Sequence, residues 1–157
     1  MNVPTSVEEF NQTYDRTNLE WTRITGTPRF EYPIDYSVAI LHVDETAGRI
    51  DFLSWWEPDH YCHYHRHLGQ TTLLVIEGEH HVVEQSDTET IHKTRQPGFF
   101  TVNPGGDDHM EYGGSEGVLV YFSCQAVDGK VFDVLADSGK VLATATIEDF
   151  TSGRLAG

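Results

Sequence analysis

The sequence predicts an all-β fold, a sandwich or barrel of short antiparallel strands. From Leu19 onward, β-branched and aromatic residues recur between turn residues at intervals of roughly 8 to 12 residues. No long stretch of helical periodicity occurs between residues 19 and 140. Glycines and prolines, which favour turns, separate the strand-like segments. These three features favour a sandwich or barrel over a helical or α/β architecture.

The two ends of the chain differ from its middle. Ser6 and Glu9 have the spacing of a helix capping box, which predicts a short N-terminal helix or arm. A last short helix is expected over residues 146–150, before a serine and a glycine interrupt it. The expected organisation is an arm or helix over residues 1–18, a barrel over residues 19–145 and a C-terminal tail over residues 146–157.

The expected strands lie between turn signals. Residues 44–48 read DETAG and predict a hairpin turn. Phe100 and Val102, like Val120 and Phe122, alternate along their strands, and we expect all four in the barrel interior. In order, the expected strands are residues 19–24, 30–32, 36–43, 49–56, 59–67, 71–77, 79–85, 90–94, 99–102, 109–112, 117–124 and 130–135.

The length and charge of the chain limit its class. A chain of 157 residues is typical of one domain. Ten basic residues against 25 acidic residues give a net charge of -15, which repels a phosphate backbone and argues against a nucleic-acid partner. No apolar run reaches about 18 residues and the N-terminus does not read as a signal peptide, so we expect no membrane association. Cys62 and Cys124 form no disulfide framework, which fits a cytoplasmic location.

A group of histidines predicts a metal site. His63, His65 and His67 alternate along the segment HYHRHLG, so strand geometry places all three on one face. Neutral imidazole is the commonest protein ligand for first-row divalent metals, and three such side chains suit an ordinary core poorly. His109 follows a Pro-Gly-Gly turn at residues 104–106 that permits a close approach of its strand. His109 is therefore the best candidate for a ligand from a second strand, with a solvated polar face as the alternative.

Two stretches resemble the two motifs of the cupin superfamily. From His65-x-His67 to Gly78 the chain is similar to the first motif, G-x5-H-x-H-x3,4-E-x6-G. From Gly98 to His109 it matches every fixed position of the second, G-x5-P-x-G-x2-H, through the histidine. The resemblance covers roughly residues 36 to 124. It implies a cupin-type antiparallel jelly-roll barrel that holds one metal ion through the histidines at positions 65, 67 and 109.

The first motif lacks its usual glutamate ligand. Thr71 stands at that position, and its hydroxyl is a weak ligand. An offset register that starts two residues earlier places Gln70 there but misses Gly78 by one residue, so the first register is preferred. Without the carboxylate, the motif resembles the three-histidine cupins, which include ChrR-type cupin domains, acetylacetone-cleaving diketone dioxygenase and 2,4'-dihydroxyacetophenone dioxygenase. Residues 65–69 read HRHLG, like the H-R-H-x-G of that group.

The three-histidine resemblance implies a function. It implies an Fe(II) dioxygenase that cleaves a C–C bond in a small diketone or hydroxyketone. A Zn, Ni or Mn-dependent lyase, isomerase or hydrolase is an alternative, as is a non-catalytic ligand-sensing cupin. A homodimer is the oligomeric state that the resemblance implies.

Two residues beside the ligands are candidate catalytic groups. Strand alternation puts His63 and Tyr61 on the ligand face. His63 is a candidate base or hydrogen-bond partner for a substrate oxygen, and Tyr61 a candidate donor to a substrate carbonyl. The same alternation directs Cys62 away from the ligands.

Overall fold

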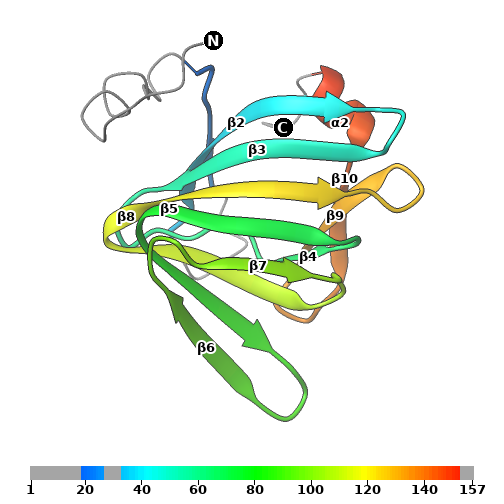
Figure 1. Cartoon of the computed structure of the whole chain (residues 1–157). Coiled ribbons are helices and arrows are strands. Elements are labelled where there is room, and N and C mark those ends of the chain that lie inside the picture. Colours follow the sequence, from blue (N-terminus) through cyan, green and yellow to red (C-terminus); the bar gives the residue numbers. More distant parts are fainter. Residues whose placement is uncertain (1–18, 27–32, 153–157) are drawn as a thin grey trace, which may run out of the picture.

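The computed structural model describes residues 19–26 and 33–152 (Figure 1). The arm or helix expected over residues 1–18 and the strand expected over residues 30–32 lie outside the described residues. The described part of the chain contains no helix long and apolar enough to cross a lipid bilayer. Its elements are β1 (Thr22–Thr25), β2 (Asp35–Asp44), β3 (Arg49–Trp56), β4 (His65–His67), β5 (Thr71–Gln85), β6 (Thr90–Arg95), β7 (Phe100–Asn103), β8 (Asp108–Gln125), β9 (Lys130–Leu135), β10 (Val141–Thr146) and α2 (Ile147–Ser152).

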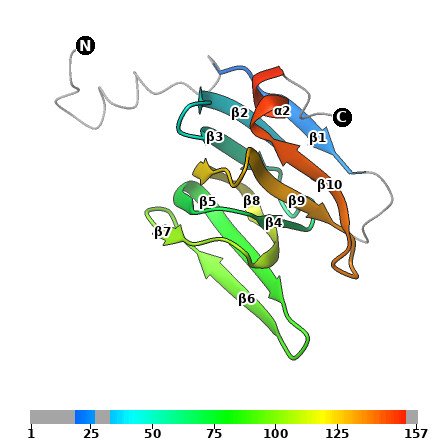
Figure 2. The same ribbon diagram turned by 90° about the vertical axis from the view of Figure 1, so that its right-hand side faces the viewer.

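The strands form one antiparallel sheet that curls into a barrel (Figure 1). Along the main path the strand order is β1-β2-β3-β8-β4-β9-β10, and β5 pairs with β6, β7 and β8. The two long strands, β5 and β8, pair from Thr71 opposite Cys124 to Glu84 opposite His109. The hairpin of β5 and β6 extends beyond one end of the barrel (Figure 2). The all-β fold is therefore confirmed, and the turn after Asp44 joins β2 to β3 as expected.

β5 and β8 are longer than the sequence predicts. Gly78 has a φ of +77° and lies between two register shifts, so it marks a bulge within one strand and not a turn. A Cβ atom on Gly78 would lie 2.1 Å from the carbonyl oxygen of Gly117 on β8, so this position requires glycine. Segments expected as separate strands merge in pairs, residues 71–77 with 79–85 and residues 109–112 with 117–124.

Two other elements also differ from the sequence prediction. A strand is predicted over residues 59–67, but β4 contains only the last three of them. Pro58 and Asp59 precede it, and Asp59 has a φ of +57°, which an extended strand does not accommodate. Face alternation therefore does not extend from β4 back to residues 61–63. β10 is absent from the sequence prediction, whereas α2 lies close to the helix expected at the C-terminal end.

The core fills the barrel around β3 and β8. Val120 and Phe122 are 0% and 2% exposed, which confirms the expectation for these two residues. Phe100 and Val102 are 60% and 50% exposed, so the same expectation is wrong for them. Thr101, between them, pairs with a buried leucine of β5, and opposite residues of an antiparallel pair share a face. The two apolar side chains of β7 therefore point outward.

Candidate metal centre

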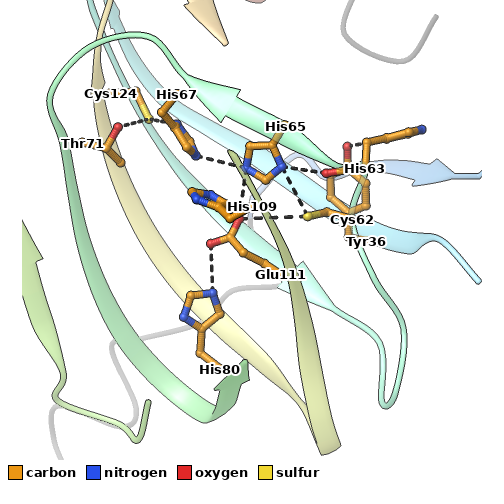
Figure 3. Close-up of polar contacts among 10 residues, drawn as sticks. All are labelled: Tyr36, Cys62, His63, His65, His67, Thr71, His80, His109, Glu111 and Cys124. Carbon is orange, nitrogen blue, oxygen red and sulfur yellow. Dashed lines mark hydrogen bonds and ion pairs between the residues drawn. The ribbon is translucent and has the colours of Figure 1, made fainter. Parts of the chain in front are cut away.

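Four potential metal ligands converge inside the barrel (Figure 3). His65 and His67 come from β4, and His109 and Glu111 come from β8. One ligand atom from each of the four lies within 4.8 Å of all the others. The two strands pair with His65 directly opposite His109, and a spacing of two residues keeps both pairs on one face. The sheet register therefore brings together the three histidines that the two motifs single out.

Contacts on both sides of the ligand strands fix their approach. The backbone N–H of Gly106 donates to the carbonyl oxygen of His67 at 2.8 Å. Gly105 has a φ of +89°, and a Cβ atom there would lie 2.5 Å from the carbonyl oxygen of Gly69. The predicted close approach at the Pro-Gly-Gly turn is thus confirmed. Beside the ligands, Arg66 of β4 donates to both carboxylate oxygens of Asp108 of β8, at 2.5 and 2.9 Å.

Hydrogen bonds orient the imidazoles of β4. The Nδ1 atom of His65 lies 2.6 Å from the carbonyl oxygen of His63, so it carries a proton that it donates there. The Nδ1 atom of His67 lies 3.6 Å from the sulfur of Cys124. The two Nε2 atoms face each other at 3.1 Å. Contacts to one ring nitrogen that direct the other toward a common centre are typical of histidines that bind a metal.

Glu111 adds a carboxylate to this centre. Its Oε2 atom lies 3.2 Å from Nε2 of His65 and 3.8 Å from Nε2 of His109. Its Oε1 atom accepts a hydrogen bond from Nε2 of His80 at 2.9 Å. Burial raises the pKa of Glu111, but hydrogen bonds from His65 and His80 outweigh burial and hold that pKa well below its ordinary value. The carboxylate is therefore ionised at neutral pH.

Burial also sets the charge of the histidines. Burial lowers the pKa of His67 to about 3 and lowers the pKa of His109 well below its ordinary value, so both rings are neutral at pH 7. Burial lowers the pKa of His65 too, but Cys62 and Glu111 outweigh it and raise that pKa well above its ordinary value. A metal ion that binds here must therefore displace a proton shared between His65 and Glu111.

The group fits a divalent metal ion. Three imidazole nitrogens and one carboxylate oxygen are a ligand set used by first-row divalent metals. Two nitrogens bound ~2.0–2.1 Å from one ion are separated by about 3 Å, which is close to the distance between the facing atoms of His65 and His67. The buried Nε2 atom of His109 has no hydrogen-bond partner among the described residues. A buried polar atom without a partner is costly, and a bound metal would satisfy it.

Sequence reasoning missed Glu111 and its partner His80. Glu111 follows His109 by two residues, so the alternation that groups the histidines of β4 also groups Glu111 with His109. Thr71 is buried but lies outside the ligand group, with its hydroxyl 3.3 Å from the carbonyl oxygen of Gly69. Gln70, the residue of the offset register, is exposed. A carboxylate is thus present in the group, and it comes from β8, the strand that carries the histidine of the second motif.

The residues before β4 do not follow the alternation of the strand. His63 lines a cavity of about 570 Å³ that reaches the ligand group, and its Nδ1 atom lies 3.2 Å from the hydroxyl of Tyr36. Tyr61 packs against Tyr112, with ring centroids 4.6 Å apart, and is not among the residues that line this cavity. Cys62 is buried with its sulfur 3.7 Å from Nδ1 of His65, so the expectation that it points away is wrong. The irregular backbone at these positions explains the difference.

Two cavities reach the ligand group from different sides. The larger, of about 570 Å³, has a volume typical of sites for small organic ligands. A smaller cavity of about 30 Å³, enough for about one water molecule, reaches His67, His109 and Glu111. The walls of the larger cavity are mostly apolar and aromatic, and it reaches His65, His67 and Glu111. The aromatic residues of these walls are Tyr36, Phe52, Trp56, Phe122, Phe132 and Phe150.

Comparison with known proteins identifies the fold. No protein-family model and no curated protein sequence matches the chain. An acetylacetone dioxygenase from Acinetobacter johnsonii is similar in structure, with a TM-score of 0.68 and 15% sequence identity over 99% of this chain and 94% of that one. An RmlC-like cupin protein from Ralstonia eutropha is also similar, with a TM-score of 0.66 and 14% sequence identity over 90% of this chain and 82% of that one.

A third structure agrees with these two. A cupin-like protein from Thermotoga maritima gives a TM-score of 0.59 and 20% identity, over 73% of this chain and 86% of that one. At these identities the likeness establishes the fold and not the activity. The cupin-type barrel implied by the two motifs is therefore confirmed, and the three histidines that the motifs single out lie together at its centre. The chain has the cupin fold.

Proposed function

We propose that this chain is a mononuclear metal-dependent enzyme that uses His65, His67 and His109 as metal ligands. The observation that carries this proposal is that three of the four grouped ligands, His65, His67 and Glu111, line the larger cavity. Ligands so placed bring one substrate into contact with a metal ion and apolar walls at once. The substrate class that fits is a small organic molecule with oxygen atoms that chelate the ion.

The reaction we favour is oxidative cleavage of a C–C bond in a small diketone or hydroxyketone. An Fe(II) ion bound by the three histidines would supply the redox chemistry and polarise the substrate oxygens. Support comes from the ligand set and from the likeness in fold to the acetylacetone dioxygenase. Phe52, Phe122 and Phe132 would hold the carbon skeleton and exclude water. Glu111 serves as the fourth ligand, or as the proton acceptor beside it.

His63 acts in this proposal as a hydrogen-bond donor to a substrate oxygen. Burial raises the pKa of Tyr36, so its hydroxyl stays protonated and is able to donate to Nδ1 of His63. In that arrangement the proton of a neutral His63 lies on Nε2. Of the two roles expected for His63, we therefore propose the donor and not the base. Tyr61 does not line the cavity, and we propose no contact between it and the substrate.

Glu111 also favours a second candidate function. With a metal bound, a carboxylate beside three neutral imidazoles lowers the net charge of the site, and such a set accepts Zn, Ni or Mn as readily as Fe. A carboxylate next to a polarised substrate can also take up a proton. A lyase, isomerase or hydrolase that uses one of these metals without redox chemistry is the reaction class that fits.

Oxygen uptake tests the favoured reaction. Protein purified without chelators is analysed for metals, loaded with Fe(II) and tested against a panel of diketones and hydroxyketones. We expect dioxygen consumption with cleaved products, and none in His109→Ala. Turnover with Zn, Ni or Mn but not with Fe(II) would support the second candidate. Saturable binding of a panel compound without turnover under any metal would contradict an enzyme and support a ligand sensor.

A further inference from the structure

A second group of histidines lies on the outer face of the barrel, away from the metal centre. His81 of β5 and His92 of β6 approach with Nδ1 and Nε2, respectively, 2.9 Å apart. Tyr112 of β8 lies opposite His81 in the sheet, and its hydroxyl is 3.0 Å from the same Nε2 atom of His92. His80 and Val82, the neighbours of His81, are buried and point inward. His81 and His92 therefore lie on the opposite face of the sheet from Glu111.

A carboxylate fixes the tautomer of His81. The Nε2 atom of His81 lies 2.5 Å from Oε1 of Glu79, and the other carboxylate oxygen accepts a hydrogen bond from Gln96 at 2.9 Å. A carboxylate oxygen at this distance accepts a hydrogen bond from the Nε2–H group of His81, which places the proton of a neutral His81 on Nε2. The lone pair of Nδ1 is thereby directed at His92. A carboxylate behind a histidine is the arrangement that orients many metal-binding imidazoles.

Stacking and neighbouring hydroxyls complete the site. The rings of His81 and Tyr112 stack with centroids 4.4 Å apart and an interplanar angle of 7°, which fixes the plane of the imidazole. The hydroxyl of Thr94 lies 3.4 Å from Nδ1 of His81. Two nitrogens bound ~2.0–2.1 Å from one ion lie about 3 Å apart, so the pair needs little movement to chelate a metal. His92 is exposed, which gives solvent access for water ligands.

We infer that His81 and His92 form a second, surface metal site that binds a borderline divalent cation such as Zn²⁺, Ni²⁺ or Cu²⁺. Imidazole suits these ions. The hydroxyl of Tyr112 lies 3.0 Å from Nε2 of His92, but burial raises the pKa of Tyr112, so this hydroxyl stays protonated and is at most a weak ligand. The net charge of -15 raises the local concentration of cations at the surface. A single hydrogen bond between the two rings is the competing description, and it requires no ion.

Zinc stoichiometry separates these descriptions. Wild-type protein, His92→Ala and the control His42→Ala are dialysed against a series of increasing free Zn²⁺ concentrations. Zinc per chain is compared at concentrations where the wild-type protein is saturated. His42 is also an exposed surface histidine, with a side chain 60% exposed beside Asp51. We expect His92→Ala to bind one equivalent less than wild type, and His42→Ala to bind as much as wild type. Equal zinc in wild type and His92→Ala would overturn the proposal.

Two further measurements guard against indirect effects. Replacement of the orienting carboxylate by Glu79→Gln should weaken zinc binding at this site about 10–100-fold without removing it. With Cu²⁺, His109→Ala should give an electron paramagnetic resonance signal with nitrogen hyperfine coupling from the surface site, and the His92→Ala/His109→Ala double variant should lose that signal. Because His109→Ala removes the barrel centre alone, failure of the surface site and failure of the proposed enzyme site are distinguishable. A signal of unchanged intensity in the double variant would also contradict the site.

Discussion

The Nε2 atom of His80 lies 2.9 Å from Oε1 of Glu111, and the two residues are only 0% and 3% exposed. The hydrogen bond holds one carboxylate oxygen and leaves the other directed at His65 and His109 (Figure 3). His80 would thus support the candidate metal centre through Glu111 and is not itself one of the four grouped ligands. A ligand supported in this way is pre-organised for binding.

Removal of this support should weaken metal binding. His80→Ala leaves the Glu111 carboxylate without its donor, so we expect metal affinity to fall about 10–100-fold. His80→Gln retains a side-chain N–H and should recover part of that loss. Competition with a chromophoric chelator measures both affinities. Equal affinity in His80→Ala and wild type would show that the hydrogen bond does not position the ligand.

The source of the carboxylate can be tested directly. Glu111→Gln removes the negative charge but keeps the size of the side chain, so metal affinity should fall by more than about tenfold. Thr71→Val removes the hydroxyl at the usual glutamate position of the first motif and should leave affinity unchanged. The same chelator competition compares the two variants. A larger loss in Thr71→Val would place position 71, and not Glu111, at the metal.

Stability without metal should decrease as the pH falls below neutrality. His67 and His109 have pKa values depressed in the folded chain, so below their ordinary value of about 6.5 the unfolded chain binds more protons. Each group then contributes up to about 1.4 kcal/mol of lost unfolding free energy per pH unit, down to its folded pKa. His65, with a raised pKa, acts in the opposite direction above neutrality.

Urea denaturation in the presence of a chelator measures this effect. Between about pH 6 and pH 4 the midpoint should move to lower urea concentration, because the unfolded chain carries protons on His67 and His109 that the folded chain does not bind. His67→Asn, which cannot titrate, should show a shallower dependence. An unchanged midpoint across this range in the wild-type chain would contradict neutral, buried imidazoles.

The bulge in β5 supplies a stability test. Gly78→Ala puts a Cβ atom 2.1 Å from the Gly117 carbonyl oxygen at a φ of +77°, so strain and clash together should cost more than about 3 kcal/mol. Gly98→Ala is the matched control, since Gly98 has a φ of +89° with nothing within 4 Å of the added atom. Thermal denaturation compares the two. Equal losses would show that the contact with β8 adds nothing to the backbone strain.

The sequence predicts the direction of side chains that alternate within regular strands. It does not predict the direction of side chains that lie just outside the end of a strand. His65, His67 and His109 were predictable because two motifs and an alternating spacing coincide. Glu111 obeys the same alternation, so the information was present in the sequence. The placement of Cys62 was not predictable by parity, because the backbone before β4 is irregular.

Glycines explain the errors in strand length. Gly78 and the pair Gly113–Gly114 are turn residues by composition, yet each lies within a continuous strand. Which role a glycine takes depends on the neighbouring strand, and local sequence does not contain that information. Likewise, the outward direction of Phe100 follows from the register of β7 with β5.

Metal content of histidine variants tests the central claim most directly. Wild type, His109→Ala and His63→Ala are loaded with Fe(II) or Zn²⁺ and analysed for metal after removal of loosely bound ions with a weak chelator. His109 contributes a ligand atom to the group within 4.8 Å, whereas His63 lines the cavity beside it. We predict that His109→Ala loses the tightly bound equivalent and that His63→Ala retains it. Full tightly bound metal in His109→Ala would contradict the assignment of the centre.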